Sequence, residues 1–567
     1  MQNDSREGGD AVKSFHELTY ERPDSDALIE EITRQTEAFR RSRSYEEARQ
    51  ILLDLTKQTG HFGTMSTLAS IRNTIDTTDA FYEKEMQFFG EAEPKIDVAM
   101  KGFYEALADS AFAESFEKEY GALYLRRIRT KIRLTEEKNV ENLVQENRLI
   151  QEYVKESAKP TTQFRGEQVN FYGLLKFMQS TDRETRREAF QAWADLYESI
   201  ADRLDAIYSE MIEVRCRMAR TLGFSDYVEM SYLRMERFDY GRNEVAAFRE
   251  QIRRELVPLC QRLFEEQKER LGLSNFHYYD EGLIYPEGNP MPEGTAGELL
   301  EKAGRMYREL SKETGAFFDF MLRYGLFDLE TKPGKQQGGY CTMLEDEKAP
   351  FIFSNFNGTR QDVDVLTHEA GHAFESYTAS RQGLLGDQYF STAEINEIHS
   401  MSMEFFTEPW MELFFGKDAD KYRYAHLVSA LEAVPYMVCV DAFQHRVYED
   451  HLTDPMERRT VWRELEKEYL PWRDYDGNEF LEQGGFWMQK QHIFMYPFYY
   501  IDYALAQFGA LEYKVRMQED REGAWQDYCR LCRAGGSRGY LELLQTGHLH
   551  SPFEDGTVRG ILEKLKI

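Results

Sequence analysis

Residues 365–375 read VLTHEAGHAFE and contain two histidines four positions apart. On an α-helix, side chains at i and i+4 project from one face, about 6 Å apart along the axis. His368 and His372 could therefore bind one metal ion, while Glu369 would lie beside that ion without ligating it. A carboxylate in that place can accept a proton from a metal-activated water molecule. The pattern H-E-x-x-H thus predicts a reactive zinc site rather than two histidines on a solvated surface.

A catalytic zinc ion needs three protein ligands and an open position for water, so the two histidines require one further partner. One class of zinc enzymes finds it by extending the motif to H-E-x-x-H-x-x-G-x-x-H. Here Glu375 and Thr378 stand at the glycine and last histidine positions of that pattern. The third ligand must therefore come from another segment.

Residues 391–410, STAEINEIHSMSMEFFTEPW, contain glutamates at helical spacing. Glu394 and Glu397 lie about one turn apart, and Glu404 follows on the same face. The spacing leaves both Glu394 and Glu397 open as the third ligand, while Glu404 could orient a histidine ring from outside the metal site. His399 points off this face and is predicted to be structural.

Residues 491–505, QHIFMYPFYYIDYAL, contain four tyrosines within eight residues. Aromatic core packing would explain Phe494 and Phe498, but so many hydroxyl groups exceed what one core needs. When a peptide bond is hydrolysed, negative charge develops on the carbonyl oxygen, and a phenol or imidazole donor lowers the barrier by about 3–4 kcal/mol. This segment is therefore a second candidate for chemistry.

Helices must position both segments, and helical periodicity fills much of the chain. Apolar residues return every three or four positions in 110–157, 183–222 and 241–271. Residues 285–300 are rich in proline and glycine and predict a loop, followed by a new helix capped near Thr295.

Strand signals are confined to two short segments, 338–344 and 350–356, which are aromatic or β-branched and bounded by glycine, proline and asparagine. They precede the H-E-x-x-H segment, whose helix could be capped by Thr359 or Asp362. Thr392 is the expected cap of the glutamate-bearing helix. The sequence therefore predicts an α protein with a small sheet beside the helix that carries the histidines.

The 567 residues carry a formal net charge of −30, which argues against nucleic acid and anionic membrane surfaces as partners. No run of about 18 apolar residues indicates a membrane span. The amino-terminal MQNDSREGGDAV lacks the apolar core of a secretory signal, so we expect a cytoplasmic protein. The six cysteines are too sparse for a disulfide framework, and the single C-x-x-C, Cys529 and Cys532, is expected to be buried in a helix.

The pattern H-E-x-G-H, followed after about 25 residues by E-x-x-S-x-x-x-E, resembles the oligoendopeptidase F family, relatives of thimet oligopeptidase and Pz-peptidase. The resemblance continues through GGYCTMLEDEKAPFIFSNFNGTRQDV and AGGSRGYLELL and covers most of residues 335–565. In that family the first glutamate of the second motif is the third zinc ligand. This implies Glu397 here, with Ser400 and Glu404 matching the rest of the motif.

The resemblance implies a mainly α, two-lobed, zincin-type metallopeptidase with a small sheet beside the active-site helix and a deep substrate channel. It implies one zinc ion, held by His368, His372 and Glu397, and short unstructured peptides as substrates. We divide the chain into an N-terminal helical region, residues 1–180, and a catalytic region, residues 181–567. The sequence makes no prediction of oligomeric state.

In this interpretation zinc activates a water molecule, and Glu369 takes its proton and delivers it to the leaving amine. By the same resemblance, the donors to the substrate and the tetrahedral intermediate are His492, Tyr496, Tyr499 and Tyr503. Tyr499 and Tyr503 are the preferred candidates for the oxyanion.

Two other functions remain open beside a zinc endopeptidase. A zinc carboxypeptidase of similar fold would need a cation for the terminal carboxylate, and the tyrosine-rich segment contains no arginine. A non-catalytic scaffold would hold structural zinc with four protein ligands, often cysteines, and none lies near the H-E-x-x-H segment. The strand at 338–344 could bind an extended peptide along its edge or form a plain structural hairpin.

Overall fold

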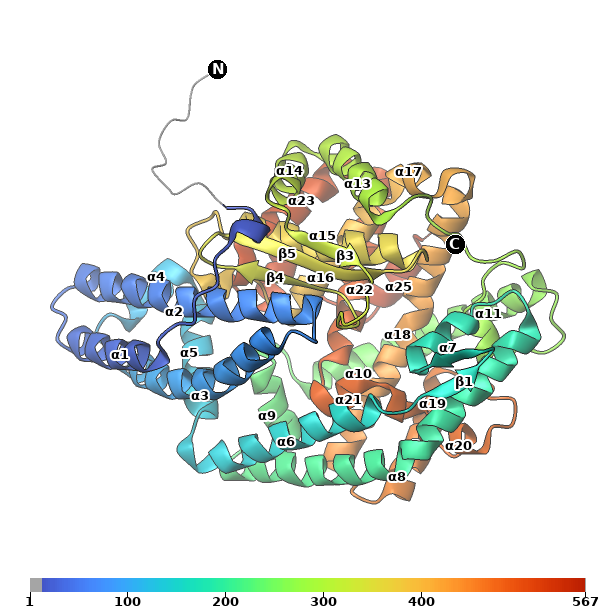
Figure 1. The fold of residues 1–567 in the computed structure, drawn as a ribbon, viewed down its shortest axis with the longest axis horizontal. Helices are drawn as coiled ribbons and strands as arrows, with labels where there is room; N and C mark the ends of the chain where they lie inside the picture. Colours follow the sequence, from blue (N-terminus) through green and yellow to red (C-terminus); the bar gives the residue numbers. More distant parts are fainter. Residues whose placement is uncertain (1–12, 566) are drawn as a thin grey trace.

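The computed structural model describes residues 13–565 and residue 567. The segment 1–12, on which the expected lack of a secretory signal depends, lies outside the described residues. Helices make up most of the described chain, and its strands form two small sheets (Figure 1). The predicted mainly α class is confirmed, while the two-lobed layout and the deep channel stay predictions.

The helices before residue 135 form a bundle drawn in blue at one side of Figure 1. They are α1 (Ser25–Arg40), α2 (Tyr45–Ile75), α3 (Ala80–Ala108), α4 (Ala113–Tyr120) and α5 (Ala122–Leu134). Ile32 and Phe39 are buried in a hydrophobic cluster that these helices share. By contrast, α6 (Val140–Ser157) contributes Leu149 and Tyr153 to the larger cluster of the remaining chain. The domain boundary drawn from the sequence stays a prediction.

The helical periodicity over 110–157 is confirmed, but the structure divides this segment into α4, α5 and α6. Gly121, between α4 and α5, has a φ of +93°, and a Cβ atom there would lie 2.2 Å from the carbonyl oxygen of Ser537. The chain turns where it meets a backbone segment more than 400 residues away. Local periodicity cannot report such a contact.

The other predicted helices are confirmed. Residues 183–222 form α8 (Arg183–Thr221), and residues 241–271 form α10 (Arg242–Gln251) and α11 (Val257–Arg270), joined by a π-helical turn. Thr295 caps α13 (Ala296–Leu310), because its hydroxyl accepts a hydrogen bond from the N–H of Glu298 at 3.3 Å. The remaining helices outside the site are α7 (Phe171–Phe177), α9 (Tyr227–Arg234), α12 (Tyr278–Glu281), α14 (Lys312–Tyr324), α17 (Glu412–Phe415), α19 (Pro455–Tyr469), α20 (Glu479–Glu482), α23 (Arg521–Ala534), α24 (Tyr540–Thr546) and α25 (Thr557–Leu562).

A three-stranded sheet lies beside the histidine-bearing helix, as predicted (Figure 1). Its strand order is β3 (Phe327–Glu330), β5 (Ala349–Phe356), β4 (Tyr340–Leu344), with β4 antiparallel and β3 parallel to the central β5. The sequence predicted β4 and β5 but missed β3, in which two apolar residues alternate with an aspartate and a glutamate. It also missed a short hairpin of β1 (Thr162–Phe164) and β2 (Glu167–Val169).

Three helices cross closely behind this sheet: α15 (Gln361–Ala379), α16 (Ala393–Thr407) and α22 (Tyr500–Glu519). A Cβ atom on Gly371 of α15 would lie 2.5 Å from the Cα of Ser400 on α16. A Cβ atom on Gly509 of α22 would lie 2.7 Å from the side chain of Ile398. Glycine at these two crossings lets the helices approach more closely than any other residue would allow.

The predicted cap of α15 is wrong. Arg360 occupies the N-cap position without a capping hydrogen bond. Asp362 lies within the helix, and its carboxylate accepts two backbone N–H groups of the preceding turn at 2.9 and 2.8 Å. It therefore fixes the turn between β5 and the helix. Thr392 does occupy the N-cap position of α16, although its hydroxyl makes no capping hydrogen bond.

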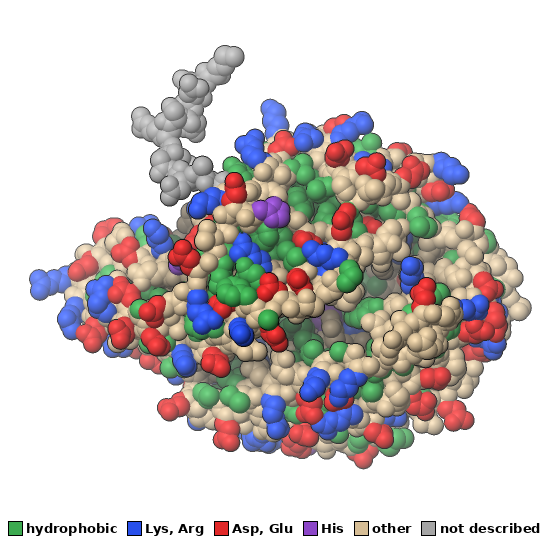
Figure 2. Space-filling view, in the orientation of Figure 1, with side chains coloured by type: hydrophobic (Ala, Val, Ile, Leu, Met, Phe, Trp, Pro, Cys, Tyr) green, Lys and Arg blue, Asp and Glu red, His purple; other side chains and the backbone are tan. Residues whose placement is uncertain are grey.

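One helical stretch of the described residues, Glu412–Glu449, is long and apolar enough to cross a membrane by length and composition alone. It consists mainly of α18 (Ala419–Glu449), and 67% of its most apolar window is buried inside the structure. Such burial is that of a core helix. In the same orientation as Figure 1, Figure 2 shows that the molecular surface is hollowed below the sheet.

Candidate metal centre

His368 and His372 on α15 and Glu397 on α16 converge on one point. The Nε2 atom of His368 lies 3.3 Å from Oε2 of Glu397, and Nε2 of His372 lies 3.6 Å from the same oxygen. One ligand atom from each residue lies within 4.8 Å of the other two. The two helices thus bring together the three residues that the sequence assigned to zinc.

The spacing of these atoms suits a zinc ion. Two ligand atoms about 2.0–2.1 Å from a tetrahedral ion lie roughly 3.3–3.5 Å apart. Burial alone would raise the pKa of Glu397, but the charges and hydrogen bonds of His372 and His368 hold that pKa well below its ordinary value. An ionised carboxylate beside two imidazoles is the donor set that a divalent transition metal binds.

Glu404, two turns after Glu397 on the same face of α16, orients the first histidine. Nδ1 of His368 lies 2.7 Å from Oε1 of Glu404, which leaves Nε2 directed toward Glu397. The other carboxylate oxygen of Glu404 lies 2.6 Å from Nε2 of His426 on α18. The predicted role of Glu404 outside the ligand set agrees with these contacts. The sequence missed His426, because this residue lies on another helix and no local spacing relates it to the H-E-x-x-H motif.

Glu369 lies on α15 between the two histidines and is only 7% exposed. Burial raises the pKa of its carboxyl group, and the charges of His368 and His372 oppose that rise. A Cβ atom on Gly339, next to β4, would lie 3.6 Å from Oε1 of Glu369. A carboxyl group with a raised pKa is suited to proton transfer near neutral pH.

Glu394, the other candidate ligand, faces away from the histidines and hydrogen-bonds with the hydroxyl of Tyr240. His399 is fully buried, as predicted for a structural residue, and burial lowers its pKa to about 3. Its Nδ1 lies 3.4 Å from the Sγ of Cys532. Cys529 and Cys532 are free and buried in α23, as the sequence predicted.

The tyrosine-rich segment lies against the carboxylate of Glu397. The hydroxyl of Tyr499 donates a hydrogen bond of 2.7 Å to Oε1 of Glu397. Tyr503 packs edge-on against Tyr499, with ring centroids 5.2 Å apart. Burial, followed by the charge of Glu397, raises the pKa of both phenols, so each keeps its proton and can donate it in a hydrogen bond.

His492, on α21 (Gln491–Met495), lies beside these tyrosines. Its ring centroid is 6.0 Å from that of Tyr499 and 6.1 Å from that of Tyr503. Burial and the charge of Lys490 lower its pKa to about 4, so its imidazole is neutral at physiological pH. The ring of Tyr496 lies 6.1 Å from His492 and is 53% exposed, at the rim of the group.

Two models of one peptidase family match this chain. The Peptidase M3 N-terminal domain matches residues 15–135, and Peptidase family M3 matches residues 176–285 and 307–561. The chain belongs to peptidase family M3. Membership of this peptidase family confirms the resemblance stated from the two sequence motifs.

Among similar proteins, the structure of Pz peptidase A with an inhibitor has a TM-score of 0.92 and 43% sequence identity, covering 97% of this chain and 98% of that one. Oligopeptidase PepF of Bacillus subtilis (strain 168) is 22% identical over 403 residues, which are 67% of this chain and 56% of the relative. The chromosomal oligoendopeptidase F of Lactococcus lactis subsp. cremoris is 24% identical over 416 residues, 68% and 64% of the two chains. The matched part thus spans 56–64% of the length of these curated relatives.

Proposed function

We propose that this M3-family protein is a zinc-dependent endopeptidase that hydrolyses internal bonds of short, unstructured peptides. The observation that carries the proposal is the convergence of His368, His372 and Glu397 within 4.8 Å of one another, beside a buried carboxyl group and several phenols. Three ligands leave one coordination position for the reaction, whereas structural zinc sites fill all four with protein.

When bound, the ion supplies a Lewis acid that activates water and polarises the scissile carbonyl group. Glu369 accepts the proton of the attacking water and passes it to the leaving amine. Tyr503 and the neutral imidazole of His492 donate hydrogen bonds to the developing oxyanion. Tyr499 joins them when its hydroxyl turns from Glu397 toward the substrate. Tyr496, at the exposed rim, donates to the substrate.

The edge strand β4 gives the peptide a place to bind. It is one of the two outer strands of its sheet, and Gly339, immediately before it, lies next to Glu369. An extended peptide that adds to this edge is held by main-chain hydrogen bonds, which select for length and extension rather than for sequence. Folded proteins cannot present such a strand, so unstructured peptides are the substrates.

The variant Glu369→Gln tests the general base. It should lose peptide hydrolysis by at least about 10²-fold, while zinc content measured by mass spectrometry of the metal stays at one ion per chain. The matched control is Glu375→Gln, which changes a buried glutamate on the same helix that hydrogen-bonds to the backbone of Ser391 at 3.0 Å. Full activity of Glu369→Gln would refute the role.

Internally quenched peptides blocked at both ends separate endopeptidase from carboxypeptidase activity. Cleavage of the blocked peptides, abolished by a chelator and restored by zinc, is the expected result. If only peptides with a free carboxyl terminus were cut, the carboxypeptidase alternative would replace the proposal. If stoichiometric zinc were bound but no peptide were cut, the protein would be a zinc-stabilised scaffold.

A further inference from the structure

A cavity of about 540 Å³ lies between α7, α12, the start of α15 and α18. Aromatic rings form much of its wall: those of Phe264, Tyr278, Tyr279, Tyr436 and Phe486. Its charged lining residues are Lys176, Glu281, Glu432 and Arg473. A cavity that combines several aromatic rings with a few charged groups has the composition of a ligand-binding site.

Two of the charged groups neutralise each other. Nε and Nη2 of Arg473 lie 3.2 and 2.8 Å from the two carboxylate oxygens of Glu281. The guanidinium also lies 4.9 Å from the ring centroids of both Tyr278 and Phe486. Lys176 is exposed at the outer end of α7. The inner wall therefore contains one carboxylate that this pair does not balance.

That carboxylate belongs to Glu432 on α18. Its Oε1 is buried without a hydrogen-bond partner, and among the described residues no ion pair reaches it. Arg270 donates to the carbonyl of Ile284 at 2.7 Å and Arg360 donates to Ser429 at 2.9 Å, and neither arginine forms an ion pair with Glu432 in the described part of the chain. Burial and the charge of Glu281 raise the pKa of Glu432 well above its ordinary value, although the charges of Arg270 and Arg360 lower it, so the carboxyl group favours its protonated form until a cation pairs with it. The side chain thus lacks a positive partner.

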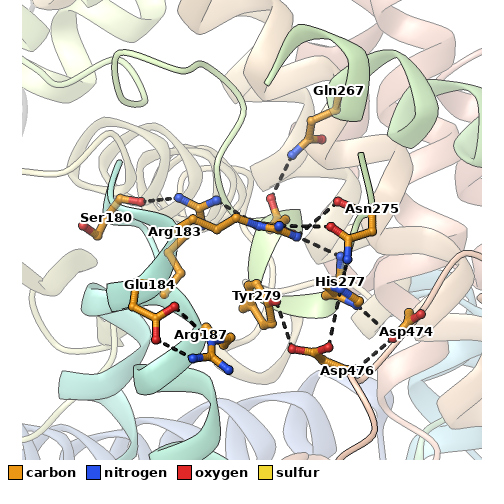
Figure 3. Close-up of polar contacts among 12 residues, drawn as sticks. Ser180, Arg183, Glu184, Arg187, Gln267, Asn275, His277, Tyr279, Asp474 and Asp476 are labelled. Carbon is orange, nitrogen blue, oxygen red and sulfur yellow. Dashed lines mark hydrogen bonds and ion pairs between the residues drawn. The ribbon is translucent and has the colours of Figure 1, made fainter. Parts of the chain in front are cut away.

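A polar network fixes the position of α12, which forms part of the cavity wall (Figure 3). Arg183 donates to Asp280 at 2.7 Å and to the backbone of Asn275 at 3.1 Å, which ties α8 to α12. Gln267 donates to the backbone carbonyl of Glu281 at 3.0 Å. The hydroxyl of Tyr279, a lining residue, bonds Asp476 at 3.1 Å. The part of the wall that α12 forms is therefore braced by hydrogen bonds to α8, to α11 and to the segment after α19.

Two elements lead from the cavity to the metal centre. Gln361 lines the cavity, and His368 follows seven residues later on the same face of α15, about 10 Å along the helix axis. Gln337 also lines the cavity, and Gly339, two residues on, lies beside Glu369. An extended peptide advances about 3.3 Å per residue, so this separation corresponds to about three residues.

We propose that this cavity binds a positively charged side chain, lysine or arginine, of the peptide substrate, about three residues from the bond that is cut. The inference rests on the proposed endopeptidase function. The ammonium or guanidinium group would pair with Glu432, whose carboxyl group would release its proton to solvent. The alkyl stem of the substrate side chain would pack against the aromatic wall, where the ring centroid of Tyr436 already lies 5.4 Å from Nζ of Lys490 and 5.9 Å from the guanidinium of Arg473. A free peptide amino terminus has the same charge, and the experiment separates the two sources.

The test measures binding of octapeptides to the full-length Glu369→Gln chain by isothermal titration calorimetry. The peptides are acetylated and amidated, share one neutral parent sequence, and carry a single lysine at each position in turn. One position should lower Kd roughly tenfold relative to the parent peptide, the effect of one hydrogen-bonded charge pair. Mass analysis of the products of the unmodified enzyme then places that lysine about three residues from the cut.

Adding Glu432→Gln should abolish the lysine preference, whereas Glu301→Gln, an exposed glutamate on α13, should retain it. Each Kd is divided by that of the parent peptide on the same variant, so a general loss of folding cannot imitate the result. Absence of a preferred lysine position, or a preference that survives Glu432→Gln, would overturn the inference while leaving the proposed function intact.

Two further arms use the neutral parent peptide with one end unblocked. A gain only from the free amino terminus would overturn the side-chain assignment and give the cavity to the end of the peptide. Tighter binding only with the free carboxyl terminus would mean that Arg473 binds that terminus in the cavity, which would also overturn the side-chain assignment. If the unmodified enzyme cut no peptide and the variant bound none, the inference and the proposed function would both fail.

Discussion

Replacing Glu404 by glutamine should weaken zinc binding without removing a zinc ligand. Burial alone would raise the pKa of Glu404, but hydrogen bonds from His368 and His426 lower it to about 2, so the carboxylate is ionised. Glutamine keeps the shape of the side chain and an oxygen that can accept from Nδ1 of His368. The substitution therefore isolates the charge from the geometry.

The size of the effect depends on two opposed charges. The hydrogen bond of 2.7 Å, an imidazole ring and a zinc–nitrogen bond place the Glu404 charge about 7 Å from the ion, worth about 5 kcal/mol at an effective dielectric constant of 20. Burial alone would lower the pKa of His426, but its hydrogen bonds to Glu404 and Glu408 raise it to about 10. This cation, about 10 Å from the ion, opposes binding by about 3 kcal/mol.

Glutamine at 404 removes the main reason for His426 to be protonated, so both charges disappear together. The net loss is then about 1–2 kcal/mol, or about tenfold in zinc affinity, at the lower end of the range for residues that orient a metal ligand. The assay is competition for zinc with a chromophoric chelator at pH 7.5. Glu394→Gln, a buried carboxylate of the same helix bonded to Tyr240, is the control and should bind zinc normally. An affinity within twofold of the unmodified chain would refute the reasoning, and a loss above 10³-fold would mean that Glu404 is itself a ligand.

Three further predictions concern neighbouring groups. Glu397→Ala should lose zinc, measured by metal content after dialysis, whereas Glu394→Ala should keep it; the reverse would reassign the third ligand. Tyr503→Phe should lower kcat by about 10²-fold with unchanged zinc affinity, whereas Tyr499→Phe, which removes the 2.7 Å hydrogen bond to Glu397, should lower both. Burial and two nearby aspartates raise the pKa of Glu345 to about 7, above its unfolded value near 4.5, so its stabilising effect is lost as pH rises through 7. Glu345→Gln should therefore gain about 1–3 kcal/mol over the unmodified chain between pH 5 and 8 in urea unfolding, and a constant difference would contradict this.

The sequence predicted the parts of the site that depend on local spacing. His368 and His372 share a face because of helical geometry alone, and the two strands before them are marked by their composition. Local spacing left Glu394 and Glu397 equivalent, and only the family motif separated them. The structure separates them physically, because Glu394 is bound by Tyr240, a residue 154 positions earlier in the chain.

What the sequence missed depends on contacts between distant segments. The helix breaks at Gly121 because the backbone of Ser537 approaches closely there. In the turn before α15, the carboxylate of Asp362 accepts backbone N–H groups of the turn instead of capping the helix. β3 was not predicted because its sequence, FDLE, lacks the β-branched residues that mark a strand. It forms a strand because it pairs with β5. None of these contacts leaves a period in the local sequence.

A series of alternating charges connects the metal centre to Lys514 on α22. Lys514 lies 2.5 Å from Glu408, whose second oxygen lies 3.8 Å from His426, which contacts Glu404, which orients His368. Each buried carboxylate in this series lies between two cationic or protonatable groups, so none pays the full cost of an unpaired buried charge. The residues come from α22, the turn after α16, α18, α16 and α15, and no two successive members belong to the same helix. The electrostatic environment of the first zinc ligand therefore exists only when these helices have packed together, which makes the charge state of the site a property of the whole fold.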